Sequence, residues 1–520
     1  MNYPPLAQEV IRNICLHMQD PALFAMAMTC QDFLEPALDT LWCELSSWKP
    51  LMSCLSSAKE PWTIRQRQPS EGNRGTIKVL YPRRVITLED LSRYLTHYAP
   101  RIRSIRLGYN TTALSIEAWQ ALHLATDGKY GVLSPLLTEF AWPSPKTIIA
   151  IMGEEAARQI SPYISLFLGD SITTLSFGIP PPLPRHTGSL EEAVERYPRL
   201  RCLIIGSSSD EGGLGGAFPE RCVTSNRLEY LEELTLPFVT TSMVRHLALL
   251  PHLKALDIRG QQKGFITPSQ TVGSDLIHGS FPSLNSLFIH WTTASEFRNL
   301  LHYIPPTNVI SKVRCFTDEP ASLFEYQEAI DTISSHCNPL TLETLVFEHM
   351  DVNYGFSRAD EPLELDITQE LNISSLFHFR NLQILTLGLD VNIRVTSVEI
   401  AAIPAAFPKI KVLDLWADVP NLTFHPPRID HTHFVAILQG CPALVKLALV
   451  FDTSRMSGAI VPGAPFPLKF LEVGKSPIYS PATVISFLKA NIPDLYMVRG
   501  CLHPQSITAR RWEEVCRRWR

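Results

Sequence analysis

The ten residues LPHLKALDIR (250–259) contain the pattern that decides how most of this chain folds. Leu253, Leu256 and Ile258 follow the template L-x-x-L-x-L, and a proline stands two residues before the first of them. Because side chains alternate along a β-strand, the last two apolar residues lie on one face of a short strand. Proline ends a preceding helix and cannot donate to a strand ladder, so it indicates the entrance to the strand.

The same pattern recurs along the chain at spacings of roughly 22–40 residues. The proline entrance is repeated in YPRLRCLIIG (197–206), FPSLNSLFIH (281–290), FPKIKVLDLW (407–416) and CPALVKLALV (441–450). Further matches, with apolar substitutes for leucine, begin at Ile102, Leu137, Ile172, Leu231, Leu342, Leu382 and Leu468, and poorer ones are Ile310/Val313/Cys315 and Ile492/Leu495/Met497. Helix-like stretches such as 242–250 and 483–488 lie between the matches.

This recurrence is typical of leucine-rich repeats. One strand–helix unit cannot bury its own apolar face, whereas stacked units share one continuous core. We therefore predict an α/β fold in which residues 86–505 form a leucine-rich-repeat solenoid, with a curved parallel sheet and helices outside. The Arg- and Trp-rich end, residues 506–520, is expected to be a capping helix, and the polar stretch 51–85 a linker or excursion.

The 520 residues have the composition of a folded chain without a basic surface: 45% are hydrophobic and the formal net charge is -5. This balance predicts no nucleic-acid binding and no basic membrane patch. No run of about 18 uncharged apolar residues could span a bilayer, and the start lacks a signal-peptide pattern. The 11 cysteines are scattered without a CxxC motif, which favours free thiols. We expect a cytoplasmic and/or nuclear protein with no membrane partner.

Residues 1–50 have a different pattern, that of short helices with apolar faces. Leu6, Val10 and Ile14 recur at four-residue spacing. Asp20 and Pro21 are suited to the start of a second helix. Three small helices cannot build a deep core by themselves, so this segment needs a partner or a neighbouring domain.

The same segment resembles an F-box. PPLAQEVIRNI (4–14) is similar to the opening of that motif, DPAL (20–23) to its middle and AMTCQDF (27–33) to its end. EPALDTLW (35–42) is similar to the phrase that follows the box in many fungal F-box proteins. Tyr3 and Cys15 stand where the motif usually has leucine and phenylalanine.

The resemblance implies a non-enzymatic adaptor that recognises substrates for an SCF-type ubiquitin ligase. The box would bind a Skp-family adaptor and, through it, a cullin, while the repeats would bind an unknown protein cargo. The expected adaptor contacts are Pro4, Pro5, Leu6, Val10, Ile14 and Leu23. An alternative is a leucine-rich-repeat interaction scaffold with a vestigial box, which acts outside ubiquitin transfer.

Residues between the leucines of each match point to the open face of the sheet. Aromatic side chains beside charges are common in binding hot spots, so we expect cargo to bind there. The candidate cargo-binding residues are Asp257, Arg259, Phe288, His290, Asp414 and Trp416, and the same reasoning includes Lys446 and Glu472.

Catalytic and cofactor sites are not expected. Asp170 and Ser171 resemble the nucleophile block of Gly-Asp-Ser esterases, and Asp430 with His433 fits their second block, which is a remote alternative. The oxyanion block is missing, and Ser171 has the register of a repeat entrance. The pair His431 and His433 lacks a third firm metal ligand, and GGLGG (212–216) lacks the Lys-Ser/Thr of a phosphate loop.

Overall fold

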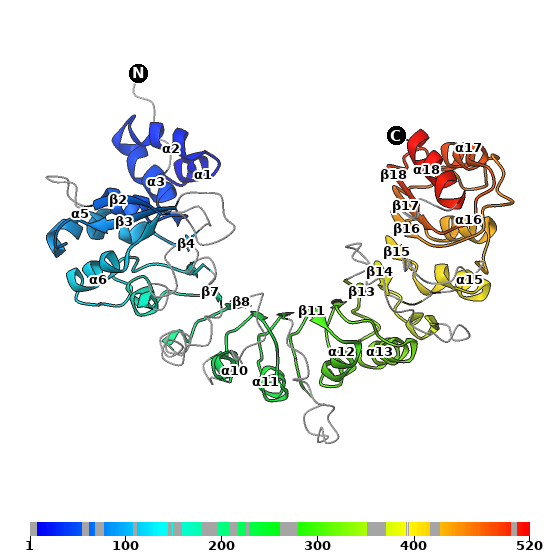
Figure 1. The fold of residues 1–520 in the computed structure, drawn as a ribbon, viewed down its shortest axis with the longest axis horizontal. Helices are drawn as coiled ribbons and strands as arrows, with labels where there is room; N and C mark the ends of the chain where they lie inside the picture. The colour runs from blue at the N-terminus through cyan, green and yellow to red at the C-terminus, as the bar shows by residue number, and fades with distance from the viewer. Residues whose placement is uncertain are drawn as a thin grey trace. The chain divides into compact units, whose positions relative to one another are not determined.

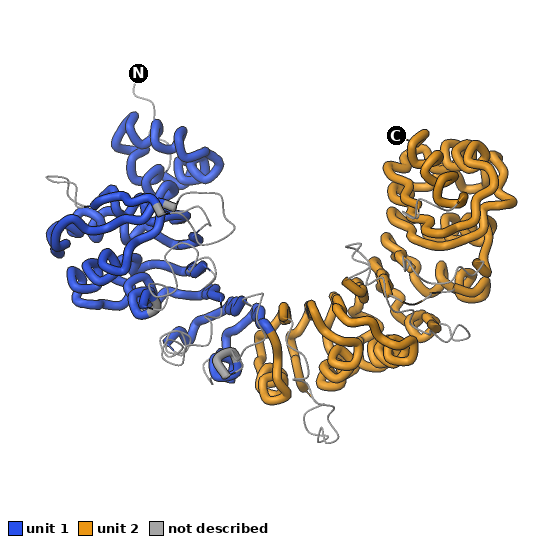
Figure 2. The backbone as a smooth tube through the Cα atoms, viewed as in Figure 1, with its two compact units in different colours: residues 1–237 blue, residues 238–520 orange. Residues whose placement is uncertain are grey.

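The computed structural model describes two compact units, residues 1–237 and 238–520 (Figure 2). In each unit, parallel strands form a sheet and helices lie along one side of it (Figure 1). This confirms the predicted fold class, a helical N-terminal segment followed by a leucine-rich-repeat solenoid. The described residues are 8–54, 62–67, 77–107, 112–143, 148, 159–178, 196–206, 217–224, 228–260, 279–350, 371–389, 391, 393, 395–415, 427–500 and 507–519.

The first unit begins with the helices of the N-terminal segment, α1 (Gln8–Leu16), α2 (Asp20–Ala27) and α3 (Gln31–Leu41). Its parallel strands follow in the order β1 (Glu44–Leu45), β4 (Ser104–Arg106), β6 (Glu139–Ala141), β7 (Thr174–Gly178), β8 (Cys202–Gly206) and β9 (Glu233–Leu236). The helices beside them are α4 (Lys49–Ser53), α5 (Leu88–His97), η1 (Ala99–Arg101), α6 (Ile116–Ala125), η2 (Ser161–Leu166) and α10 (Ala217–Val223).

A second, small sheet lies in the first unit. It contains β2 (Trp62–Arg67), β3 (Ile77–Pro82) and β5 (Ala113–Leu114), with β2 and β3 antiparallel. The stretch 51–85, which we expected to be a linker or an excursion, therefore contains two strands, and Leu51 and Leu80 are buried.

The second unit repeats one strand and one helix in most of its turns. Its strands are β10 (Ala255–Arg259), β11 (Ser286–Thr292), β12 (Lys312–Thr317), β13 (Thr344–His349), β14 (Ile384–Gly388), β15 (Val412–Asp414), β16 (Lys446–Ala448), β17 (Phe470–Gly474) and β18 (Met497–Gly500). Its helices are α11 (Thr241–Leu247), α12 (Ala294–Leu301), α13 (Leu323–His336), η3 (Ser374–Leu376), α15 (Ser397–Ala406), α16 (His431–Gly440), α17 (Pro481–Asn491) and α18 (Ile507–Trp519).

The strands are held by buried leucines on one face and by a regular ladder of backbone hydrogen bonds. Leu256 and Leu287 are fully buried and are paired in register. The carbonyl of Asn285, just before β11, accepts the amides of Ser311 and Lys312 at 2.8 and 3.1 Å, and this arrangement is repeated from strand to strand. Each new strand thus satisfies the backbone groups of the one before it.

The helices begin at capping residues that the sequence supplies. Ser322 accepts the amide of Glu325 while the Glu325 carboxylate accepts the amide of Ser322, which caps α13. Thr87 and Asp90 form the same box at the start of α5, and Arg84 holds Asp90 through two hydrogen bonds of 2.8 and 2.6 Å. These contacts satisfy amides at the first turn that have no partner within the helix.

One predicted register is wrong. The poor match Ile492/Leu495/Met497 placed Met497 on the buried face, but Met497 is exposed and Val498 is buried. In β18, Val498 pairs with Leu471, the second residue of its own match, so the template begins at Leu495, three positions later than we expected. The side chains of a strand alternate, so a shift by an odd number of residues exchanges the two faces.

Helix α18 covers the last strand of the second unit. Trp512 is buried and its Nε1 donates to the carbonyl of Ser476 at 2.7 Å, while Trp519 Nε1 donates to the carbonyl of Leu495 at 2.7 Å. The outer side of the helix has exposed arginines, including Arg510 and Arg517. The helix thus covers apolar surface and shows charge to the solvent.

We expect Trp512→Ala to lower the free energy of unfolding by about 3–5 kcal/mol, because it removes a fully buried indole and its hydrogen bond. Denaturant unfolding followed by circular dichroism measures the change. Arg510→Ala, on the exposed side of the same helix, is the control and should stay within about 0.5 kcal/mol of the parent. Equal stability of the two variants would contradict a capping role for α18.

Candidate protein-binding surfaces

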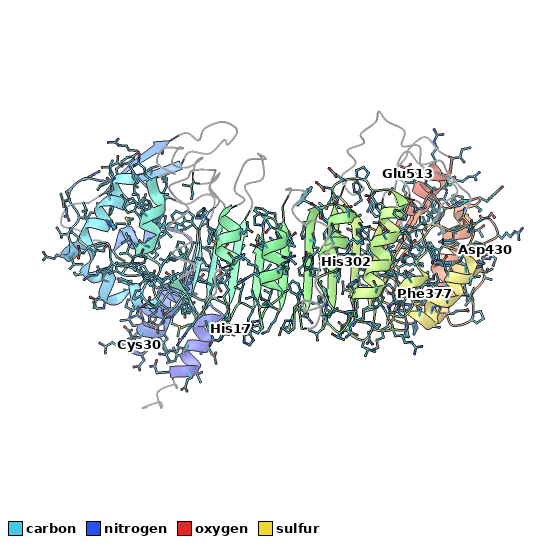
Figure 3. All side chains as sticks on the ribbon, turned by 90° about the horizontal axis from the view of Figure 1, so that it is seen from below. His17, Cys30, His302, Phe377, Asp430 and Glu513 are labelled. Carbon is cyan, nitrogen blue, oxygen red and sulfur yellow. The ribbon has the colours of Figure 1, made fainter. Side chains whose placement is uncertain are left out.

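Helices α1, α2 and α3 pack around a small core of their own. That core contains Ile11 and Cys15 from α1, Leu23 and Ala27 from α2, and Ala37 from α3. The turns between the helices lie near His17 and Cys30 (Figure 3). Leu23, which we expected to contact an adaptor, is only 2% exposed, so its side chain belongs to this core.

The same helices expose large apolar side chains on their other sides. In α1, Val10 and Ile14 are 44% and 43% exposed and stand four residues apart, on one face of the helix. At α2, Phe24 and Met28 are 64% and 72% exposed and are also four residues apart. We call these four residues the box face. Of the other expected contacts, Pro4, Pro5 and Leu6 lie outside the described residues.

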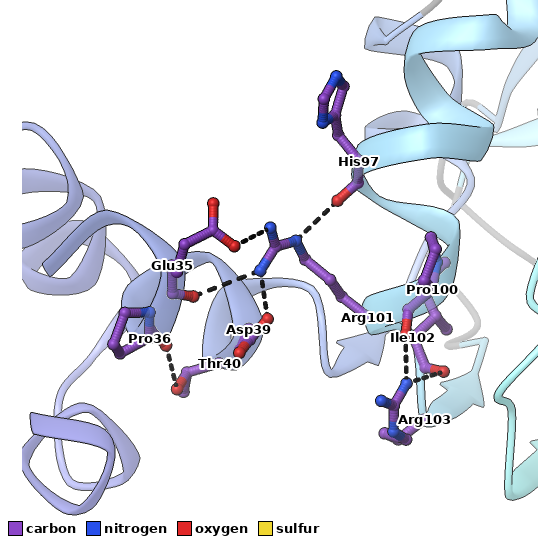
Figure 4. Close-up of polar contacts among 9 residues, drawn as sticks. All are labelled: Glu35, Pro36, Asp39, Thr40, His97, Pro100, Arg101, Ile102 and Arg103. Atoms are coloured by element: carbon purple, nitrogen blue, oxygen red, sulfur yellow. Dashed lines mark hydrogen bonds and ion pairs between the residues drawn. The ribbon is translucent and has the colours of Figure 1, made fainter. Parts of the chain in front are cut away.

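Arg101 ties α3 to the first repeats (Figure 4). Its guanidinium donates to the Glu35 carboxylate at 2.6 Å, to Asp39 and to the carbonyl of His97 at 2.7 Å. The Arg101 side chain is only 13% exposed, so these charge-assisted bonds are partly shielded from water. The box is therefore joined to η1 and α5 by polar contacts.

Trp42 and Cys43 complete this connection. The Trp42 ring packs on Tyr98 with centroids 4.3 Å apart, and on Tyr94 at 6.3 Å. The carbonyl of Cys43 accepts the amides of Arg103 and Ser104, both at 2.9 Å. The end of the box segment is thus already hydrogen-bonded to the first part of the repeats.

The open face of the second unit brings together four of the predicted cargo residues. Asp257 and Arg259 in β10 are in register with Phe288 and His290 in β11. The next strand adds three residues to the same face. Of these seven residues, we call the six other than Asp257 the cation–aromatic platform: Arg259, Phe288, His290, Lys312, Arg314 and Phe316.

Rings and cations contact one another on this platform. The Arg314 guanidinium lies 5.5 Å from the centroid of the Phe288 ring, and the His290 ring stacks on Phe316 at 4.9 Å and 17°. Arg259 is paired with Asp257 at 2.6 Å. Burial lowers the pKa of His290, although Asp257 opposes this effect, so the imidazole is neutral at neutral pH.

A second polar group lies on strands β13 to β17 of the same face. Lys446 Nζ is 2.7 Å from Asp414 and 3.1 Å from Glu472. Burial raises the pKa of Glu348, and Asp414 raises it further. We call Glu348, Asp414, Lys446 and Glu472 the Lys446 group. The predicted cargo residue Asp414 thus belongs to this group and not to the platform. Trp416 lies outside the described residues.

Lys312, Arg314, Phe316 and Glu348 were not among the predicted residues. The first three belong to β12, whose match has valine and cysteine in place of leucines and seemed poor. The rule that residues between the buried ones face outward identifies all four when it is applied to β12 and β13.

Of the residues considered for chemistry, Asp430 and His433 have a structural role. Asp430 caps α16 (Figure 3), accepting from Thr432, and pairs with His433 at 2.8 Å. Ser171 lies in the turn before β7, in the other compact unit. Among the described residues, no cluster of three or more His, Cys, Asp or Glu could hold a metal. Residues 212–216 lie outside the described residues.

None of the described helices is both long and apolar enough to cross a membrane.

The comparison with solved structures finds remote likenesses. No family model and no curated protein matches the chain. Among solved structures it is similar to the TLR13–ssRNA13 complex, with 15% identity and a TM-score of 0.36, over 75% of this chain and 46% of that one. It is also similar to the yeast Rad7 and Elc1 complex, with 12% identity and a TM-score of 0.31, over 81% and 82% of the two chains. The chain spans less than half the length of the first of these.

We expect Arg101→Ala to loosen the box, because Glu35, Asp39 and the His97 carbonyl lose a partly shielded partner. The local stability of α3 should fall by about 1.5–3 kcal/mol, the usual range for hydrogen bonds to charged groups. Hydrogen exchange of residues 31–41 measures it. Arg106→Ala, which removes a more exposed ion pair with Glu139, is the control and should cost at most about 1 kcal/mol. Unchanged hydrogen exchange in α3 would argue against this role of Arg101.

A second expectation concerns pH. Because burial lowers the pKa of folded His290, the unfolded chain binds a proton there more readily, and stability is lost as pH falls below the unfolded value of about 6.5. His290→Gln should therefore reduce the drop in melting temperature between about pH 7.5 and about pH 5.5. His97→Gln, at an exposed position, is the control. If the melting temperature of His290→Gln falls as much between the two pH values as that of the parent, His290 is not the source of the pH dependence.

Proposed function

We propose that this chain is a substrate-recognition adaptor of an SCF-type ubiquitin ligase. In this proposal the helices α1–α3 bind a Skp-family adaptor, which links the chain to a cullin, and the repeats bind a protein cargo. The observation that carries the proposal is the box face, where four large apolar side chains stay exposed although a core lies directly behind them.

The box face is unusual for a part of the chain that already has a core. Ile11 and Cys15 turn inward, whereas Val10 and Ile14 on the same helix remain about half exposed. Val10 with Ile14 and Phe24 with Met28 form two exposed apolar pairs on neighbouring elements of the box, and exposed apolar surface of this kind is typical of protein-binding sites. Full burial of a Val, Ile, Phe or Met side chain is worth about 1.5–3 kcal/mol. A partner that buries the exposed parts of the four box-face side chains would therefore gain several kcal/mol of binding free energy.

The connection between box and repeats also supports an adaptor. The contacts of Arg101 with Glu35 and Asp39, and those of Trp42, hold the box against the first repeats without using the box face. Those contacts come from α3 and from the residues after it, whereas the box face belongs to α1 and α2. A partner can therefore cover the box face while the box stays attached to the repeats.

The open face of the second unit supports the cargo role. The platform residues are exposed or half-buried and are set on strands, which hold their backbone in a fixed register. Binding sites on regular elements are more precise than sites on loops. Aromatic rings beside arginines supply both apolar area and charge for recognition of a protein.

We expect the pair Ile14→Asp and Phe24→Asp to abolish binding of a purified Skp-family adaptor, because two charges would be buried in the interface. Loss of two buried apolar contacts at about 2–3 kcal/mol each corresponds to at least a hundredfold weaker affinity. Isothermal titration calorimetry measures it. Leu124→Asp and Val398→Asp change residues that are 78% and 77% exposed outside the box and should leave the affinity unchanged.

Thermal melting of each variant shows that it remains folded. Unchanged adaptor binding by a folded box-face variant would refute the proposed contact. If the adaptor binds normally but no cullin joins the complex, the result favours the alternative of a repeat scaffold that acts outside ubiquitin transfer. A deletion is a poorer test, because Leu45 and Trp48 are buried in the first unit and removal of residues 1–48 would disturb the repeats.

A further inference from the structure

The chemistry of the cation–aromatic platform indicates what kind of cargo it accepts. Arg259, Lys312 and Arg314 supply three cations, His290 is neutral, and the adjacent Asp257 offsets one charge. Within the described residues, neither Lys312 nor Arg314 forms a salt bridge with a carboxylate; the Arg314 guanidinium lies over the ring of Phe288 and acts on Glu348 of the next strand only through longer-range attraction. Two cations are therefore available to an anionic ligand.

As far as the described residues show, the platform is a surface and not a pocket. The cavity beside it, lined by Gly260, His290 and Trp291 among others, has a volume of about 30 Å³. That is room for roughly one water molecule, whereas sites for small organic ligands enclose about 300–1,000 Å³. The platform is thus better suited to an extended segment that lies across the strands than to an enclosed small molecule.

A bulge at the end of β11 fixes the edge of the platform. The register shifts between His290 and Thr292, and Trp291 between them has φ 61°, a conformation that bulky side chains rarely adopt. Such strain costs about 1–3 kcal/mol and is concentrated at functional sites. Bulges redirect side chains, and this one lies directly after His290, which stacks on Phe316.

The neighbouring Lys446 group limits the charge that a ligand can have. Its three carboxylates and one ammonium leave two negative charges on the same face of the same unit. Glu348 lies on the strand next to Arg314, two positions beyond Val346, its register partner; this diagonal separation of about 7–8 Å is comparable with a Debye length of about 8 Å. A polyanion such as RNA would be repelled there, whereas a segment with one or two acidic groups would not.

We propose that the platform binds an extended acidic segment of a protein, with a carboxylate or phosphate at Arg314 and an apolar side chain against Phe288 and Phe316. This inference rests on the proposed cargo role and specifies its chemistry. An arginine already stacked on a ring pairs with an anion while the ring gives the segment apolar contact. The Lys446 group then sets a preference for protein over nucleic acid.

The test uses the full chain and four fluorescein-labelled probes in fluorescence anisotropy. The first peptide is GSGEFEGSG, the second has glutamine in place of both glutamates, and the third has phosphoserine there. The fourth probe is an oligouridine of about ten nucleotides. We expect the glutamate or the phosphoserine peptide to bind, and the one that binds more tightly identifies the preferred anion. Binding of that peptide should weaken with added salt.

Variants assign the binding to the platform. Arg314→Glu should weaken the anionic peptide roughly tenfold or more, because attraction becomes repulsion. Phe288→Ala removes the ring without a change in charge and should weaken it severalfold. Arg455→Glu makes the same charge change at an exposed arginine outside the platform and is the matched control, with less than a twofold effect expected. Melting curves confirm that each variant is folded.

Three results would overturn the inference. They are equal binding of the glutamine peptide, no binding of any peptide, and oligouridine binding that exceeds that of both anionic peptides. The last would favour a nucleic-acid ligand. Skp-family adaptor binding is measured on the same preparations, so a failure here with normal adaptor binding leaves the box proposal intact. Loss of adaptor binding in the box-face variants has no bearing on the peptide result.

Discussion

The parallel ladder of short strands is the constraint on which the rest of the structure depends. Each strand buries alternate side chains, such as Leu256 and Ile258 in β10, and forms backbone hydrogen bonds with the next strand. A slip of one residue would bury charges and expose leucines. The register that forms the core therefore also decides which residues appear on the open face, and Arg314 is presented because Val313 and Cys315 are buried.

Most of the ladder could be predicted because leucine spacing and proline entrances are local signals. β1 was missed, since a strand of two residues, Glu44 and Leu45, shows no periodicity and pairs with a strand some sixty residues later. The pair β2 and β3 was missed because polar residues and turn formers dominate that stretch. At β18 the template gave Met497, where burial selects Val498. In these places long-range pairing, which a local pattern does not contain, decides the structure.

The candidate sites were predictable to different degrees. Alternation along β10 and β11 led directly to Asp257, Arg259, Phe288 and His290, which the structure brings together. The box was less certain, because helical spacing defines apolar stripes without saying which stripe meets the core. In α1 the stripe of Ile11 and Cys15 packs against α2 and α3, while Val10 and Ile14 remain outside. That choice depends on where the other two helices lie.

Only Trp42 and Cys43 separate α3 from β1, and both are engaged with the first repeats. The box is therefore fixed directly to the first repeats and is not joined to them by a flexible linker. Whatever the box holds has a set angle to the first strands, with no search through linker conformations. The chain itself thus fixes how a partner bound to the box is oriented relative to the first repeats. Little conformational entropy is lost when such a complex forms.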